Sequence, residues 1–167
     1  MSNVNGLNDV ISRLNRLSAN LQREVKEIVA FNIGEIETAA IRDAPGPGDV
    51  IRVQGGSIEQ DRISSRRRGQ TPISQGIGSK EYNNGYSGSV FVEASVGDIA
   101  AYVEFGTGQS AASYLATVDP DWRATARRFF VDGKGKIINQ PYLYPAYLRQ
   151  RIIFVNELKR ALKDVKI

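Results

Sequence analysis

The chain has 167 residues, a formal net charge of +4, and neither cysteine nor histidine. Its length suits one domain over residues 1–167, and 41% hydrophobic residues can supply a core. Without cysteine and histidine, disulfides, thiolate metal sites, and the commonest general base and metal ligand are all missing. We therefore expect no enzyme, no catalytic or metal-binding residue and no cofactor. No apolar run is long enough to span a membrane and no secretory leader is recognisable, so we also expect a soluble protein without a membrane partner.

A long amphipathic helix is predicted over residues 7–44. Apolar residues recur there every three or four positions, and Pro45 ends the pattern. Such a helix would span roughly 57 Å, whereas a compact chain of this length is about 40 Å across. We therefore expect the helix to bend, to break or to project from the rest of the chain. A break is expected at Asn32–Gly34, where the apolar pattern falters and a glycine weakens the helix. Residues 31–44 are expected to face the core, while the first half could instead pack on a neighbouring subunit.

Two extended loops are predicted, over residues 55–89 and 109–126. The first is rich in glycine and serine and poor in large apolar residues, so it has little surface to bury. It also carries the densest positive cluster of the chain, which consists of Arg62, Arg66, Arg67 and Arg68. These four arginines are possible contacts to DNA or to a neighbouring subunit. No aromatic stacking platform or groove-reading motif accompanies them.

Three or four short strands are predicted. Val50–Val53 is a short apolar run after a Pro-Gly turn, and Val90–Val96 alternates between two faces. Arg128–Val131 and Lys136–Ile138 flank a glycine-containing turn, which is typical of a β-hairpin. We therefore expect a small, mostly antiparallel sheet.

The segment Asp98–Gly108 combines a helical pattern with an unusual carboxylate. Apolar residues recur at helical spacing from Ile99, Asp98 can cap the helix start, and Gly106 can end the helix. A strand stays an alternative, because apolar and polar residues also alternate there. Burial of Glu104 would cost several kcal/mol unless backbone N–H groups or an arginine paired with it, which indicates a structural or interface role. The candidate residues of this motif are Tyr102, Glu104, Phe105, Gly106 and Thr107.

A second motif, Gln140–Ala146, leads into a predicted C-terminal helix over residues 145–165. Proline suits the first helical turn, and basic residues near the end of the helix complement its dipole. The expected core-facing residues of this helix are Leu148, Ile152, Val155, Leu158, Leu162 and Val165. The candidate structural or interface residues of the motif are Pro141, Tyr142, Leu143, Pro145 and Ala146.

Three segments in this order resemble one viral family. They are Ile41–Pro45 at the end of the first helix, Tyr102–Gly108, and Gln140–Ala146 at the start of the last helix. With them the chain resembles the small neck or tail-completion proteins of long-tailed, lambdoid-type bacteriophages, often described only as tail components. The resemblance extends from about Asn5 to Val165. It departs from the family at residues 55–89 and 109–126, which look like enlarged loops.

The resemblance implies an α+β fold in which the long N-terminal helix and the C-terminal helix pack on a small sheet with large loop insertions. It further implies a virion protein of the neck or tail, assembled in the host cytoplasm, whose copies form a hexameric or dodecameric ring. The ring would join the head-closure or connector protein to the tail tube or its terminator, with genome DNA in the channel. Glu104 and Thr107 would hold the bend after Phe105, and Phe105 and Tyr142 would lie in the core or at a subunit joint. The alternative, that these residues only shape the monomer, stays open.

Two further functions stay open. A tail terminator that caps the tail tube fits the same resemblance. A nucleic-acid-binding module would use the arginine cluster and the basic C-terminal helix, and its affinity for DNA would fall steeply with salt. Catalysis finds no support, because the sequence contains no G-x-S-x-G elbow, no phosphate-binding loop with its flanking elements and no metal-ligand spacing.

Overall fold

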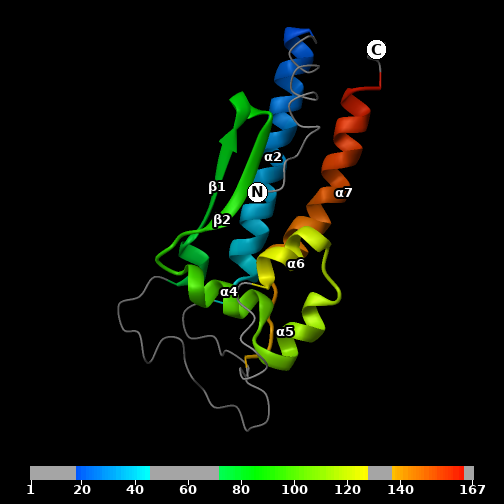
Figure 1. Ribbon diagram of the computed structural model, residues 1–167. Helices are drawn as coiled ribbons and strands as arrows, with labels where there is room; N and C mark the ends of the chain where they lie inside the picture. Colours follow the sequence, from blue (N-terminus) through cyan, green and yellow to red (C-terminus); the bar gives the residue numbers. More distant parts are fainter. Residues whose placement is uncertain (1–17, 46–71, 128–136, 164–167) are drawn as a thin grey trace.

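The computed structural model describes residues 18–45, 72–127 and 137–163. Two long helices, α2 (Ala19–Asp43) and α7 (Leu143–Ala161), lie side by side and antiparallel (Figure 1). A β-hairpin packs on α2, and the short helices α4, α5 and α6 gather at the end of the molecule where α7 begins (Figure 1). The fold is therefore α+β, as predicted. The N-terminal helix packs on the sheet, whereas the C-terminal helix packs mainly on the N-terminal helix.

Helix α2 is continuous through the predicted break at Asn32–Gly34. It begins after Ser18, whose hydroxyl accepts a hydrogen bond from the Leu21 backbone N–H at 3.4 Å. It ends at Asp43, because Ala44 before Pro45 takes an extended conformation. The predicted break was wrong, and residues 7–17 of the predicted helix lie outside the described residues.

A buried polar contact explains why the apolar pattern falters at Asn32. The Asn32 side-chain amide donates to Glu157 Oε2 at 2.6 Å on α7, and its carbonyl accepts from Gln150 Nε2 at 2.8 Å. Asn32 also donates to the Ile28 carbonyl at 2.8 Å within α2. Because both amides are almost fully buried and bonded, this contact fixes how α2 and α7 align along their length.

The hairpin consists of β1 (Ile77–Tyr82) and β2 (Ser87–Val92), paired antiparallel from Ile77 opposite Val92 to Tyr82 opposite Ser87. Gly88 lies against α2, and a Cβ there would overlap Ile33 Cδ1. The glycine therefore allows the strand to approach the helix closely. This hairpin corrects the second part of the extended loop predicted over 55–89, and residues 55–71 lie outside the described residues. Its first strand has only Ile77 buried and is otherwise polar and largely exposed, so its pattern is weak.

The other strand predictions meet the structure only in part. The strand predicted at Val90–Val96 exists as far as Val92, but residues 94–96 form a turn into the next helix. The predicted strands Val50–Val53 and Arg128–Val131, and the start of Lys136–Ile138, lie outside the described residues.

Three short helices follow the hairpin: α4 (Gly97–Phe105), α5 (Gly108–Leu115) and α6 (Pro120–Ala126). The helix predicted after Asp98 is confirmed over the strand alternative. It begins at Gly97, two residues earlier than predicted, so Asp98 lies in its first turn and is not its cap. The extended loop predicted over 109–126 was wrong. Alanines favour a helix in α5, and Pro120 occupies the first helical position of α6, where its missing N–H has no cost.

The core has two parts. The first lies between α2, the hairpin, α4 and the start of α7, and contains Ala40, Ala44, Ile73, Ile77, Ala100, Val103, Tyr142 and Ala146. The second lies among the short helices and contains Phe105, Leu115, Val118, Ala126 and Tyr144. Because Tyr142 and Tyr144 flank the first residue of α7, the start of this helix belongs to both parts.

The apolar stripe of α7 was predicted to face the core, but three of its residues are exposed, while Leu158 and Leu162 are half-buried. Leu148 is 37% exposed, Ile152 68% and Val155 39%. The buried residues of α7 are instead Tyr144, Ala146 and Gln150, which include a polar one. Pro145 does lie in the first turn of α7, as predicted, although the helix begins at Leu143. Val165 lies outside the described residues.

Candidate functional site

Glu104 joins the two motifs of the sequence. It lies in the last turn of α4 and is 3% exposed. Its Oε2 accepts the backbone N–H of Tyr142 at 2.7 Å and of Leu143 at 2.9 Å, and its Oε1 accepts that of Tyr144 at 3.0 Å. These are the N–H groups at the start of α7, which have no partner inside the helix. Glu104 therefore caps a helix about forty residues further along the chain.

The hydrogen-bond partners in this contact suit a carboxylate. Helix α7 has no side-chain cap of its own, and a negative charge at a helix N-terminus interacts favourably with the helix dipole. The Tyr114 hydroxyl adds a fourth donor, 3.3 Å from Glu104 Oε1. Burial raises the pKa of Glu104, and these four hydrogen bonds oppose that rise. Because every neighbour is a donor, the hydrogen bonds are complete only in the ionised form.

The tyrosines around Glu104 are held as neutral donors. Burial, together with the carboxylate beside them, raises the pKa of Tyr114 and Tyr142. The Tyr142 side chain is 1% exposed, and its hydroxyl lies 3.4 Å from the Ala100 carbonyl of α4. This geometry suits a structural carboxylate better than an acid that exchanges protons with a substrate.

Backbone contacts extend the joint on the other side of Glu104. The Gln140 N–H donates to the Val103 carbonyl at 2.8 Å, and the Thr107 N–H donates to the Ile137 carbonyl at 2.9 Å. In return, Thr107 Oγ1 accepts the Ile137 N–H at 2.9 Å. The segments 103–107 and 137–144 are thus held together along their length.

Gly106 is required at the centre of these contacts. Its φ of 73° and ψ of −171° are accessible almost only to glycine. A Cβ at this position would lie 2.8 Å from the Asn139 backbone nitrogen and 3.0 Å from Ser110 Oγ. Ser110 and Asn139 are themselves bonded, at 2.8 Å between Oγ and Oδ1. Any side chain at 106 would therefore separate the two segments.

An aromatic cluster covers the outside of the joint. The ring centroids of Phe105 and Trp122 are 5.8 Å apart, and those of Trp122 and Tyr144 are 5.2 Å apart. The Tyr144 hydroxyl accepts the Asp119 N–H at 2.9 Å, which ties α7 to the start of α6. Glu104 is 3% exposed next to this cluster, and hydrogen bonds are stronger where water is scarce. We refer to Glu104, Gly106, Thr107 and the segment 137–144 as the Glu104 joint.

The structure brings the candidate residues of both motifs together. Glu104, Phe105, Gly106, Thr107, Tyr142 and Ala146 are buried, and Tyr102, Pro141, Leu143 and Pro145 are half-buried. Arg62, Arg66, Arg67 and Arg68 lie outside the described residues. Asn139 within the joint, and Tyr114, Ser110 and Trp122 in contact with it, were not among the predicted residues. Of these four residues, only Trp122 stands out in the sequence, because it is the sole tryptophan of the chain.

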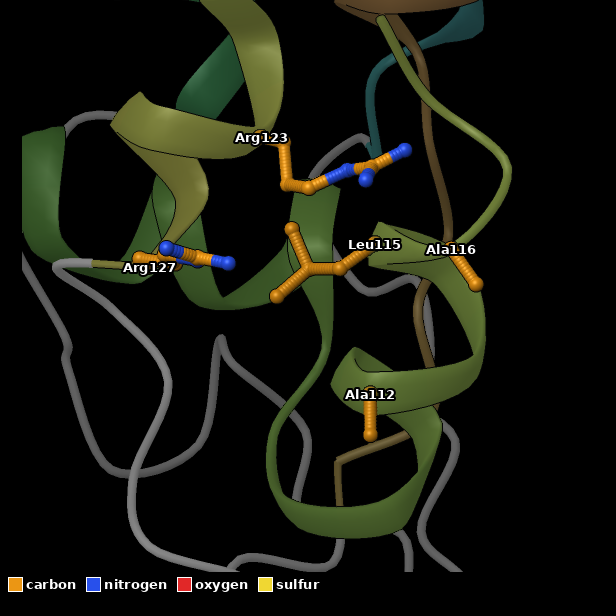
Figure 2. A pocket seen from close by; sticks show the side chains of 5 residues that line it. All are labelled: Ala112, Leu115, Ala116, Arg123 and Arg127. Carbon is orange, nitrogen blue, oxygen red and sulfur yellow. The ribbon is translucent and has the colours of Figure 1, made fainter. Parts of the chain in front are cut away.

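An open hollow of about 310 Å³ lies beside the joint, between α5 and the end of α6. Figure 2 shows Leu115 in the middle of this hollow, with the side chains of Arg123 and Arg127 beside it. Arg123 also donates to the Val118 carbonyl at 3.1 Å. The remaining lining residues, Ala112 and Ala116, offer no acid, base or nucleophile. The hollow can attract an anion but contains no catalytic group.

In the part of the chain that the structure describes, no group of three or more acidic side chains could hold a metal ion. In the same residues, no helix is both long and apolar enough to cross a membrane. No family model, curated protein or solved structure matches the chain.

Proposed function

We propose that this chain is a structural subunit of the neck of a long-tailed bacteriophage. Its copies form a ring that joins the head connector to the tail tube, and the genome passes through the channel of that ring. The subunit acts mechanically and has no catalytic residue, cofactor or membrane partner. Its partners are further copies of itself, the head-closure or connector protein, and the tail tube or its terminator.

The observation that best supports this proposal is the Glu104 joint. The two segments that most specifically carry the resemblance to neck proteins, Tyr102–Gly108 and Gln140–Ala146, are far apart in sequence. In the structure they form one unit, because Glu104 accepts three consecutive backbone N–H groups of the second segment. Because a buried carboxylate needs hydrogen-bond partners, a chain that contains the first segment also needs the second.

The physical demands of a ring also agree with such a joint. A ring closes only if each subunit presents its two contact surfaces at one fixed angle, since small errors add up around the circle. The joint fixes the direction of α7 relative to the short helices, and the contact of Asn32 with Gln150 fixes α7 along α2. A subunit built in this way presents its outer surfaces in one geometry, which lowers the cost of association.

The proposal is tested by measuring assembly and docking. The purified protein is examined by light scattering for its mass, and by negative-stain imaging alone and after mixing with cognate tail tubes and DNA-filled heads. We expect rings, and added density at one end of the tails that allows heads to attach. An unrelated basic protein of similar net charge serves as the control for non-specific adherence.

Two outcomes would overturn the neck assignment. A protein that caps tail tubes and limits their length, but never recruits heads, would be a tail terminator. A monomer that ignores heads and tails, yet binds DNA with an affinity that falls steeply between low and physiological salt, would be a nucleic-acid-binding module.

A further inference from the structure

The outward face of α7 is apolar and has no cover among the described residues. We call Leu148, Ile152, Val155 and Lys159 the outer face of α7. Gln150 points toward Asn32 of α2. Successive helix residues are rotated by about 100°, so residues two positions before or after Gln150 point about 200° away from it, to the opposite side of α7. Leu148 and Ile152 are therefore on the side opposite α2. Ile152 is 68% exposed, the most of any large apolar residue in the described chain.

Exposed apolar side chains in such a row indicate a contact surface. Leu148, Ile152 and Val155 follow each other at intervals of four and three residues, so they form one stripe along the helix. Scattered apolar residues are normal on protein surfaces, but a contiguous stripe rimmed by polar groups marks an interaction site.

The charges around this stripe are positive. Helix α7 carries four basic residues against one acidic residue, and that acid, Glu157, is engaged by Asn32. Arg149 and Arg151 form ion pairs within the chain, with Asp43 at 2.6 Å and Asp119 at 3.3 Å. Lys159, in line with the stripe, and Arg160 are exposed. The surface therefore suits a partner that is apolar at its centre and acidic around it.

Helix α2 presents a surface of that kind. We call Glu24, Glu27, Phe31 and Glu35 the outer face of α2; they recur at intervals of three and four and are all exposed. Phe31 is 55% exposed, and Glu27 has only a long contact of 3.8 Å to Arg23. An apolar centre with acids around it is complementary to the outer face of α7.

The two outer faces lie on different sides of the molecule. Asn32 faces α7, and Ile33 on one side of it meets Gly88 of the hairpin. Phe31, on the other side of Asn32, therefore points away from the hairpin. Helix α7 cannot turn its outer face toward α2 of the same chain, because Gln150, on the opposite side of α7, is already bonded to Asn32 of α2.

We propose that copies of this chain dock head to tail, with the outer face of α7 on one copy covering the outer face of α2 on the next. A contact between two different surfaces of identical subunits is heterologous, and it generates a closed ring when the rotation between copies closes. This inference rests on the proposed function and identifies the surface that would build its ring.

The chain's lack of cysteine allows a direct test by disulfide cross-linking. The double variant Phe31→Cys/Ile152→Cys is assembled, alone or on tails, and mildly oxidised. We expect a ladder of covalent oligomers on a non-reducing gel that ends at the ring number. The matched control, Ser113→Cys/Ile152→Cys, places the first thiol on the exposed surface of α5 and should give no ladder.

The outcomes separate this inference from the proposed function. Rings of normal mass without the ladder would overturn the assignment of the faces and leave the ring intact. Dimers from Ile152→Cys alone would show a two-fold contact between α7 helices, and an intrachain bond from Leu14→Cys/Ile152→Cys would show that the chain covers its own stripe. Either result overturns the head-to-tail contact. Failure to assemble both alone and on tails or heads would overturn the proposed function itself.

Charge reversal gives a second, independent test. Glu24→Lys/Glu27→Lys reverses the charge of the outer face of α2. Lys159→Glu/Arg160→Glu reverses the charge of Lys159 on the outer face of α7 and of the exposed Arg160 next to it. Each double variant should lose assembly while its unfolding midpoint stays unchanged, because these side chains are exposed. The combination of all four substitutions should restore assembly. Equal loss in the combined variant would overturn the pairing of these two faces.

Discussion

The start of α7 and its middle relate to the rest of the chain in opposite ways. At the start, a carboxylate is buried with four donors around it, and Tyr142 is 1% exposed. In the middle, Ile152 and its apolar neighbours face outward. The charged residue is inside and the apolar ones are outside, which is the reverse of the usual distribution. A buried, fully bonded charge fixes geometry, whereas an exposed apolar stripe is typical of a contact surface.

The largest expected loss of stability comes from removing the buried carboxylate at the start of α7. We expect Glu104→Ala to lower the free energy of unfolding by about 3–5 kcal/mol, because it leaves three backbone N–H groups buried without a partner. Glu104→Gln keeps the shape but turns an amide toward donors, and should cost about 1–3 kcal/mol. Urea unfolding followed by circular dichroism measures both.

The Tyr114→Phe variant is the control for this measurement. It removes only the hydrogen bond of 3.3 Å and should cost about 1 kcal/mol or less. If Glu104→Ala were no more destabilising than Tyr114→Phe, the carboxylate would not hold the start of α7.

Backbone geometry at the joint gives the next largest effect. We expect Gly106→Ala to cost about 1–3 kcal/mol, because a Cβ must adopt a φ of 73° and crowd the Asn139 nitrogen. Gly97→Ala is the matched control, since nothing lies within 4 Å of its Cβ position and it opens α4 with no positive φ. That variant should be neutral or stabilising by a few tenths of a kcal/mol. Thermal unfolding of both proteins shows whether the loss of stability is specific to position 106.

Local sequence signals predicted the joint better than they predicted its surroundings. Glu104 among apolar residues, Gly106 after a helical pattern and Pro145 within a first turn are all short-range features, and each has the expected role. The hydrogen bonds from Glu104 to residues 142–144 span about forty positions, and no periodicity encodes a contact at that distance. The resemblance paired the two segments but gave no atomic reason for the pairing.

The predictions that were wrong, at Asn32, β1 and the stripe of α7, have physical causes as well. Asn32 interrupts an apolar stripe and therefore resembles a break, although its amide is satisfied by α7 and keeps the helix intact. Strand β1 was missed because most of its side chains face solvent and its stability comes from pairing with β2. The stripe of α7 was assigned to the core because periodicity shows that a face is apolar and does not show whether the same chain covers it.

The smallest expected change in the free energy of unfolding comes from a comparison of the buried and exposed sides of α7. Gln150 is buried and bonded to Asn32, so Gln150→Ala should cost about 1–3 kcal/mol by leaving the Asn32 carbonyl oxygen without its donor. Ile152→Ser removes a larger apolar group, yet should change the unfolding free energy of the monomer by less than about 0.5 kcal/mol, because the side chain is already in water. Urea unfolding at protein concentrations below assembly measures both variants. A large loss of monomer stability in Ile152→Ser would place the stripe in the core after all, whereas a loss confined to assembly would keep the outer face of α7 as the surface that the next subunit covers.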